Sequence, residues 1–226
     1  AYVFDCHEID IVSQAMQVQS QRYDVPILPI AKEDHQKTYA TLLNVFLEIY
    51  RIVMQGADFP AHFQSVDQED FYFYSGFHHQ TEKQHIQFDM QNYLAKYPII
   101  PALSKMLADF ELEEDSEHRK RVRENRNQAI RKLEERNKDK RHIERERLAS
   151  YGLCIGMLLF IAQTGANLDT AQQLQLDTME ILPSTQGRRF SGTKSRAGDK
   201  IVRPEFGVKF EPVFRKILEL REWYVQ

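Results

Sequence analysis

One segment near the C-terminus combines glycines, hydroxyls and cations at close spacing. It reads Gly192-Thr193-Lys194-Ser195-Arg196-Ala197-Gly198, and the runs on either side of it favour short β-strands. Between Gln186 and Lys209, seven basic residues against two acidic ones give a local charge of +5. Lysine and arginine donate charge-assisted hydrogen bonds to phosphate oxygens. The segment is therefore a candidate polyanion-binding hairpin, although the whole chain has a net charge of −3.

A second basic stretch runs from Arg119 to Arg147, where thirteen basic and six acidic residues give a local charge of +7. Its few apolar residues indicate a solvated helix, or two helices broken near Asn137. Its cations either follow the phosphates of a nucleic acid or pair with acids three or four positions away. A charge-laced solvated helix is the commoner explanation. The acids are Glu124, Glu134, Glu135, Asp139, Glu144 and Glu146.

Two other groups of residues could bind a ligand, but each also has an ordinary structural interpretation. His78, Glu82 and His85 would share one face of a helix and supply three ligands to zinc. The flanking sequence lacks a helical apolar stripe, so surface histidines are the simpler interpretation and no metal is expected. The aromatic run from Phe71 to Tyr74 suits base stacking, but Glu69 and Asp70 precede it and core packing is favoured.

The elements that position these residues follow from hydrophobic spacing. A helix is predicted from Asp34, as N-cap, to Met54, with Gly56 as its stop. Residues 57–92 are aromatic and irregular, and a short helix is predicted from Pro98 or Pro101 to about Leu112.

The C-terminal third has a different character. An apolar helix is predicted from Leu148 to Thr164, ended by Gly165, and a short helix from Asp169 to Leu176. Strands are predicted at 179–182, 188–192 and 200–203, followed by an amphipathic helix from Glu211. The expected fold is mainly α, with a small antiparallel sheet of about three strands near the C-terminus.

Residues 148–226 resemble the first half of the catalytic domain of tyrosine recombinases, the phage-integrase family. In that family a helix ends in Thr-Gly-Leu-Arg, continues as Ser-Glu-Leu, and leads to a three-stranded sheet whose hairpin carries a lysine. This chain has Thr164-Gly165-Ala166-Asn167-Leu168-Asp169-Thr170-Ala171, with Leu174 at the next core leucine and Lys194 in the hairpin. The resemblance covers about 80 of the 226 residues.

The resemblance implies that Lys194 enters the minor groove and can protonate the leaving 5′ oxygen during phosphoryl transfer to a tyrosine. Asn167 replaces the first catalytic arginine and Thr170 replaces an acid. Losing one preorganised electrostatic contact costs ~10²–10³ in rate. No histidine follows His142, and Tyr224 is interpreted as packing or surface. The DNA-contacting residues implied by the resemblance are Arg188, Arg189, Lys194, Arg196 and Lys200.

Composition sets the remaining expectations. The two cysteines, Cys6 and Cys154, give neither a disulfide framework nor a zinc site. The longest apolar stretch, Leu153 to Ala162, is about half of the ~20 residues that a membrane span needs. We therefore expect a cytoplasmic protein with no membrane partner, no cofactor and no bound metal. The chain also has the features of a fragment excised from a longer protein.

The leading hypothesis is a DNA-binding fragment of a site-specific tyrosine recombinase, an integrase acting in the integration or recombination of phage or other mobile DNA. It would bind double-stranded DNA, alone or with other copies of itself, without cutting it. Residues 1–147 would form a helical region, corresponding by position to an arm-like or core-binding-like part, and 148–226 the first part of the catalytic domain. The alternative is a catalytically silent, helical protein-interaction module on a recombinase-like scaffold. A histidine-based metalloenzyme ranks last.

Overall fold

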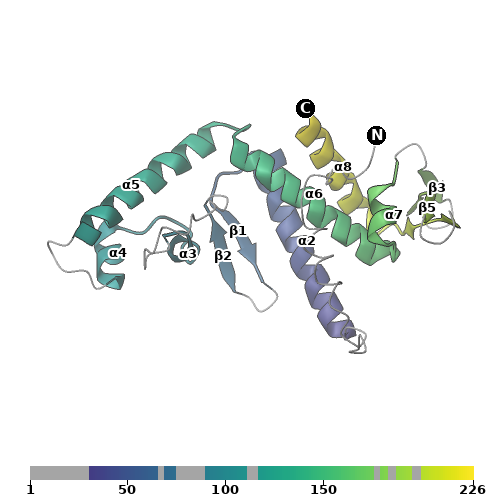
Figure 1. Ribbon diagram of the computed structural model, residues 1–226, viewed down its shortest axis with the longest axis horizontal. Helices are drawn as coiled ribbons and strands as arrows, with labels where there is room; N and C mark the ends of the chain where they lie inside the picture. Colours follow the sequence, from purple (N-terminus) through teal and green to yellow (C-terminus); the bar gives the residue numbers. More distant parts are fainter. Residues whose placement is uncertain are drawn as a thin grey trace. The chain divides into compact units, whose positions relative to one another are not determined.

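The computed structural model describes residues 31–65, 69–74, 90–110, 117–175, 179–182, 187–194 and 200–226 (Figure 1). The fold is mainly α with small antiparallel sheets, as the sequence predicts. The helices are α2 (Lys32–Met54), α3 (Met90–Leu94), α4 (Leu103–Asp109), α5 (Glu117–Lys138), α6 (Ile143–Thr164), α7 (Leu168–Gln172) and α8 (Glu211–Val225). The strands are β1 (Ala61–Gln64), β2 (Asp70–Phe73), β3 (Glu180–Leu182), β4 (Gly187–Arg189), β5 (Gly192–Lys194), β6 (Lys200–Val202) and β7 (Glu205–Phe206).

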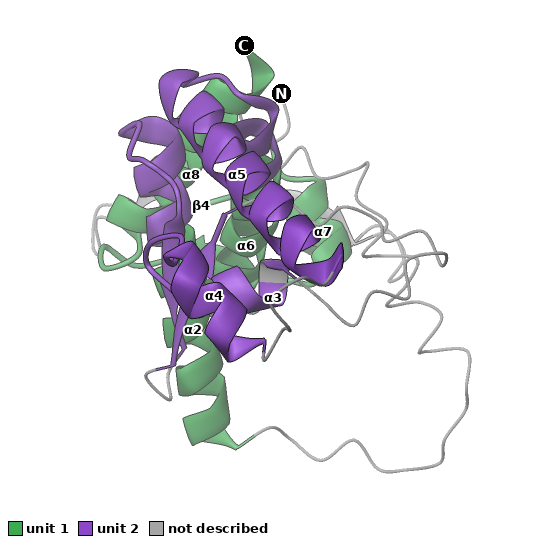
Figure 2. Ribbon diagram, turned by 90° about the vertical axis from the view of Figure 1, so that its left-hand side faces the viewer, with its two compact units in different colours: residues 1–46, 149–226 green, residues 47–148 purple. Residues whose placement is uncertain are grey.

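The chain divides into two compact units, coloured separately in Figure 2. Unit 1 contains residues 1–46 and 149–226, and unit 2 contains residues 47–148. The long helices α2 and α6 each contribute residues to both units. Unit 1 therefore includes residues 149–226 together with the first part of α2.

The predicted helices lie close to their expected positions, with three corrections. The first helix begins at Lys32, so Asp34 is not its N-cap; inside the helix, the carbonyl of Asp34 accepts a 2.8 Å hydrogen bond from the Thr38 hydroxyl. The basic stretch breaks after Lys138, but its last five residues start α6 instead of forming a separate piece. The helix expected at 169–176 is the shorter α7. Gly56 and Gly165, with φ near +65°, follow α2 and α6 as expected.

The prediction of irregular structure for residues 57–92 is wrong in part. Strands β1 and β2 form an antiparallel pair with Ala61 opposite Phe73, and α3 begins at Met90. The core-packing interpretation of the aromatic run holds for Tyr74, which is buried and donates a hydrogen bond to the carbonyl of Tyr97 at 2.8 Å. Phe71 instead remains 48% exposed. These strands have only four residues each, too few to show a clear alternation in sequence.

Unit 2 is organised around a buried arginine, Arg145. Its guanidinium donates hydrogen bonds to four backbone carbonyls, including one from the last turn of α2, and it lies 5.1 Å from the Phe59 ring centroid. Carbonyls at a helix C-terminus lack intrahelical partners and carry partial negative charge, so they suit a cation. The accepting carbonyls are those of Ile52, Ala57, Arg136 and Asp139.

Hydrogen bonds from the side chain of Asn137, at the end of α5, hold the loop that follows α2. The Asn137 side chain accepts a hydrogen bond from the backbone N–H of Phe59 at 2.8 Å and donates one to its carbonyl at 3.2 Å. Elsewhere in unit 2, α4 packs on α5 through Met106, Leu107 and Val122. The apolar side of the basic helix α5 is thus part of a core, and only its other side faces solvent.

The core of unit 1 lies between α6, α8 and the strands. Aromatic rings dominate this core, with Phe160 of α6 making edge-to-face contacts with Phe190 and Phe206. Gly156 permits close packing of the two helices, because a Cβ at this position would lie 2.9 Å from Cγ1 of Ile217. The rings in this cluster are Phe160, Phe190, Phe206, Phe210 and Phe214.

The strands of unit 1 form one bent antiparallel ladder. β4 pairs with both β3 and β7 in a three-stranded sheet, which confirms the expected sheet near the C-terminus. The predicted strand at 188–192 is divided into β4 and β5 by Phe190 and Ser191. A 3.0 Å hydrogen bond from Phe190 N to Pro204 O bridges the break. Residues 187–194 therefore run antiparallel to residues 200–206, and β5 and β6 form the outer end of the hairpin.

Candidate nucleic-acid interface

The outer end of the hairpin brings two of the predicted DNA-contacting residues together. Lys194 of β5 and Lys200 of β6 are direct register partners, and Thr193 pairs with Ile201 beside them. Like charges at opposing positions of an antiparallel pair are unfavourable without a counter-charge. An anion such as a phosphate supplies that counter-charge. Arg196 lies between the two strands in sequence, outside the described residues.

Arg188 forms an ion pair inside the protein. Its Nη2 donates a hydrogen bond to Oε1 of Glu211 at 2.7 Å, and both side chains are largely buried. Glu211 begins α8, where the positive end of the helix dipole favours a carboxylate. The pair joins β4 to the start of α8. Arg188 therefore acts first as a residue that fixes the hairpin to the helix behind it.

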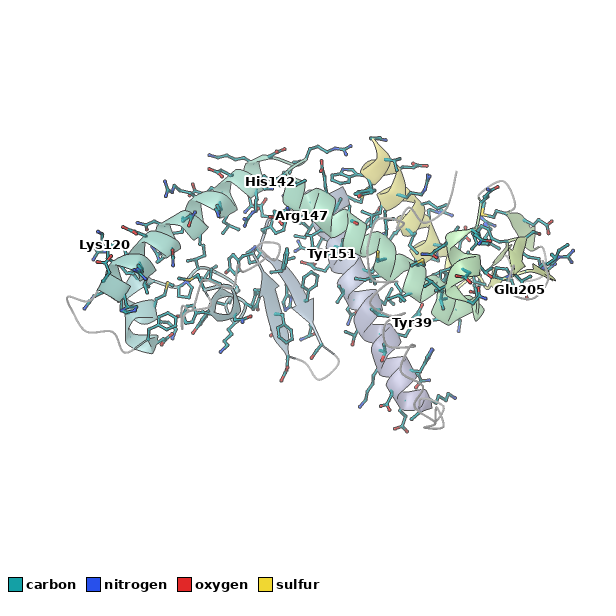
Figure 3. The ribbon with its side chains drawn as sticks, viewed as in Figure 1. Tyr39, Lys120, His142, Arg147, Tyr151 and Glu205 are labelled. Atoms are coloured by element: carbon teal, nitrogen blue, oxygen red, sulfur yellow. The ribbon has the colours of Figure 1, made fainter. Side chains whose placement is uncertain are left out.

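Arg189 has an ion pair of a weaker kind. Its Nε and Nη2 both donate to Oε2 of Glu205, at 3.0 and 2.7 Å, and the two residues are register partners in β4 and β7. Figure 3 labels Glu205 among the strands. Both side chains are substantially exposed, and exposed ion pairs contribute only about 0–1 kcal/mol. A phosphate can therefore replace the Glu205 carboxylate at small cost, unlike the partner of Arg188.

Asn167, which stands where the family has its first catalytic arginine, has a local structural role. The residue is the N-cap of α7, and its Oδ1 accepts a 2.8 Å hydrogen bond from the backbone N–H of Thr170. Thr170 itself is buried. Arginine has no acceptor atom and cannot make this cap. Asn167 and Thr170, the two residues that differ from the recombinase pattern, are therefore joined by one hydrogen bond. Asn167 caps the start of α7, and the uncharged Thr170 is buried inside that helix.

Arg188 and Arg189, the two arginines of β4, both hold carboxylates. Tyr224 lies near the end of α8 and is 37% exposed, which agrees with its interpretation as a packing or surface residue.

The second basic stretch divides into structural and exposed cations. Arg136 and Arg145 are buried, and burial lowers the pKa of both guanidinium groups. Arg136 donates a hydrogen bond to the carbonyl of Tyr74, and Arg126 donates one to that of Pro101 at 2.8 Å. Lys140 holds Gly56 O and the Asp58 carboxylate. The local charge of +7 therefore overstates the charge that is free to meet a polyanion.

The histidine cluster at 78, 79 and 85 with Glu82 lies outside the described residues. Within the described ranges, histidine, cysteine and acidic side chains form no group of three that could hold a metal ion. One described helix, α6, is long and apolar enough to cross a membrane, and half of its apolar stretch is buried inside the structure.

Comparisons of this chain with protein-family models, curated proteins and solved structures found no match.

Sequence reasoning identified Lys194 and Lys200 but missed the acids that engage the neighbouring arginines. Glu205 and Glu211 lie 16 and 23 positions from their partners. Cross-strand pairing depends on a register that bulges and breaks can shift, so the sequence does not fix these pairs. The only available signal was the presence of Glu205 within the basic region and of Glu211 just after it.

Proposed function

We propose that this chain is a DNA-binding part of a tyrosine-recombinase-like protein that acts in the integration or recombination of phage or other mobile DNA. It binds double-stranded DNA in the cytoplasm, alone or with other copies of itself, and does not cleave DNA by itself. Lys194 contacts the duplex and is the candidate proton donor to a leaving 5′ oxygen in the complete protein. Arg189, Arg196 and Lys200 add phosphate contacts around it.

One observation supports this proposal most strongly. The chain runs from the apolar helix α6 through Gly165 and α7 into β3 and β4, then through β5 and β6, which pair Lys194 with Lys200, and returns in β7 to pair with β4. That order is the one expected from the recombinase resemblance. The opposed register of Lys194 and Lys200 also suits a phosphate backbone more than a protein core.

The test is a salt titration of binding to a labelled DNA duplex, followed by fluorescence anisotropy. The variants Lys194→Ala and Lys200→Ala should each weaken binding and lower the slope of log K against log salt by about one. Lys209→Ala, an exposed lysine in the turn before α8, removes the same charge and serves as the control. Equal slopes for all three variants, or no affinity of the wild-type chain at low salt, would reject the proposal.

A second function, a protein-interaction module, is favoured by one feature of α6. Tyr151 and Leu158, seven residues apart on one side of that helix, are 44% and 46% exposed. Paired exposed apolar side chains of this kind are typical of contact surfaces. A wild-type chain that fails to bind duplex DNA at low ionic strength but self-associates in a Tyr151-dependent manner would favour this second function.

A further inference from the structure

Seven of the nine cations of α5 fall into two groups with different surroundings, and the other two, Arg119 and Lys132, are half-buried. Arg126 and Arg136 point into unit 2 and donate hydrogen bonds to backbone carbonyls. The second group is exposed to solvent and consists of Lys120, Arg121, Arg123, Arg131 and Lys138. Figure 3 labels Lys120 near the start of α5. The first group stabilises the fold, so any role in binding belongs to the second.

The exposed cations of α5 do not form the ion pairs that their sequence spacing allows. Glu134 lies three residues after Arg131 and four before Lys138, and Glu124 lies four after Lys120. Within the part of the chain that the structure describes, no carboxylate oxygen lies within ion-pair distance of these lysine and arginine side chains. The interpretation of this helix as a ladder of internal ion pairs therefore lacks its expected contacts.

Three of these cations lie in a row along the helix. Lys120, Arg131 and Lys138 are separated by eleven and seven residues, which are close to whole numbers of turns at ~3.6 residues per turn. The row is ~27 Å long at ~1.5 Å per residue. A duplex presents one phosphate charge per ~1.7 Å of axis. A straight row of cations on a rigid helix can therefore meet several phosphates without rearrangement of the backbone.

We propose that this row, the cationic face of α5 formed by Lys120, Arg131 and Lys138, binds the phosphate backbone of duplex DNA independently of base sequence. The inference rests on the proposed function and extends it to unit 2. The hairpin and the α5 face are separate contacts, each with its own contribution to the salt dependence. Asn127 lies between Lys120 and Arg131 on the same side and is exposed, so it adds an uncharged donor to phosphate oxygens.

Duplex DNA fits the cationic face of α5 better than a membrane or a protein does. Helices that lie on membranes insert an apolar face, whereas the apolar side of α5 is packed against α4 through Val122. Protein interfaces concentrate aromatic residues and are poor in lysine and glutamate. The exposed side of α5 carries no Phe, Tyr or Trp; its lysine, arginine and amide side chains can donate to phosphates, and Glu124 and Glu134 lie beside them.

The deciding experiment compares two triple variants of the full chain by anisotropy with a labelled duplex of about three helical turns. The first is Lys120→Gln, Arg131→Gln, Lys138→Gln. The control removes three exposed lysines elsewhere: Lys32→Gln, Lys37→Gln, Lys96→Gln. The α5 variant should lower the salt slope by about two to three, at ~0.9 per lost phosphate contact. The control should leave the slope unchanged.

A variant that should bind DNA more tightly distinguishes the loss of DNA contacts from the loss of folded protein. Glu124→Gln, Glu134→Gln removes two exposed carboxylates beside the same cations and should strengthen binding and steepen the slope. Equal slopes for the α5 variant and its control, with Lys194→Ala still weakening binding, would overturn this inference and leave the proposed function standing. A wild-type chain without salt-dependent affinity for DNA would reject both. Binding of phosphatidylserine vesicles through these residues, in place of DNA, would overturn the assignment of the partner.

Discussion

The side-chain oxygen of Asn167 accepts a 2.8 Å hydrogen bond from the backbone N–H of Thr170 and so caps the start of α7. A catalytic arginine at this position would need to project towards a phosphate, whereas the asparagine side chain turns back onto its own helix. The cap explains locally why a polar, uncharged residue suits the position. It also gives the position a stability role that is separable from any role in DNA chemistry.

The first prediction tests this cap. Asn167→Ala removes the acceptor and should lower the free energy of unfolding by about 1 kcal/mol, whereas Asn167→Asp keeps it and should be nearly neutral. Asn167→Arg should lose stability like the alanine variant, because arginine has no acceptor. Urea unfolding monitored by the fluorescence of Trp223 measures all three. Equal stability of the alanine and aspartate variants would contradict the cap assignment.

The second prediction concerns the buried cation of unit 2. Arg145→Ala leaves the carbonyls of Ile52 and Ala57 without their donor, and each buried unsatisfied polar group costs about 1–3 kcal/mol. We therefore expect a loss of several kcal/mol, or a chain that does not fold. Arg123→Ala, at an exposed position of α5, should change stability by less than about 0.5 kcal/mol. Thermal unfolding of both proteins gives the comparison, and similar losses would show that Arg145 is not the organising residue.

A structural element was predictable from the sequence when the residues that specify it lie close together in the chain. Helices α2, α6 and α8 follow from apolar spacing and from a glycine stop, and all of these signals lie within one helix. The role of Arg145 does not, because its acceptor Ile52 O is 93 positions away. A carbonyl acceptor has no signature in the sequence, so a buried arginine cannot be distinguished there from a solvated one. The same reason explains why the basic stretch was assigned a larger free charge than it has.

Prediction of the hairpin was limited in the same way, although its interacting residues lie closer together in the sequence. Its lysine was identifiable from flanking glycines and from the resemblance, and the strands fell close to their predicted positions. The partners of Arg188 and Arg189 depend on which residues lie opposite β4, and the same register continues from the β4–β7 pair to the β5–β6 pair. Strands of two or three residues are too short for alternation alone to fix that register.

The third prediction tests the close approach of β4 and β7. A Cβ at Gly187 would lie 1.9 Å from the carbonyl oxygen of Phe206, which is backbone and cannot move alone. Gly187→Ala should therefore break this end of the sheet and destabilise the protein strongly. Gly207→Ala is the matched control, because a Cβ there meets nothing within 4 Å. Near-identical melting temperatures of the two variants would contradict the strand pairing.

The fourth prediction is a pH dependence in unit 2. Asp109 accepts hydrogen bonds from the hydroxyl of Tyr93 at 2.7 Å and from Nζ of Lys105 at 3.1 Å. These bonds, that of Tyr93 first, hold the pKa of Asp109 below its ordinary value. A carboxyl with a lowered folded-state pKa stabilises the protein above its unfolded pKa of about 4, and this contribution is lost as the pH falls through the folded value.

Stability of the wild type should therefore fall more steeply below about pH 4 than that of Asp109→Asn, which has no proton to gain. Acid unfolding curves of the two proteins, measured by circular dichroism, test this. Glu69→Gln removes an exposed carboxylate outside this cluster and serves as the charge-matched control. Parallel acid curves for the wild type and the Asp109 variant would show that these hydrogen bonds do not persist in solution.

The fifth prediction uses the two arginine–glutamate pairs to separate binding from folding. Glu205→Gln releases the exposed Arg189 from its carboxylate, so duplex affinity should rise and the salt slope should steepen by up to about one. Glu211→Gln removes the same charge but breaks the buried pair with Arg188, so it should lower the melting temperature with a smaller gain in affinity. Glu222→Gln, exposed on α8, controls for net charge alone. If Glu205→Gln binds no better than Glu222→Gln, Arg189 is not a phosphate contact and the interface is confined to the lysine end of the hairpin.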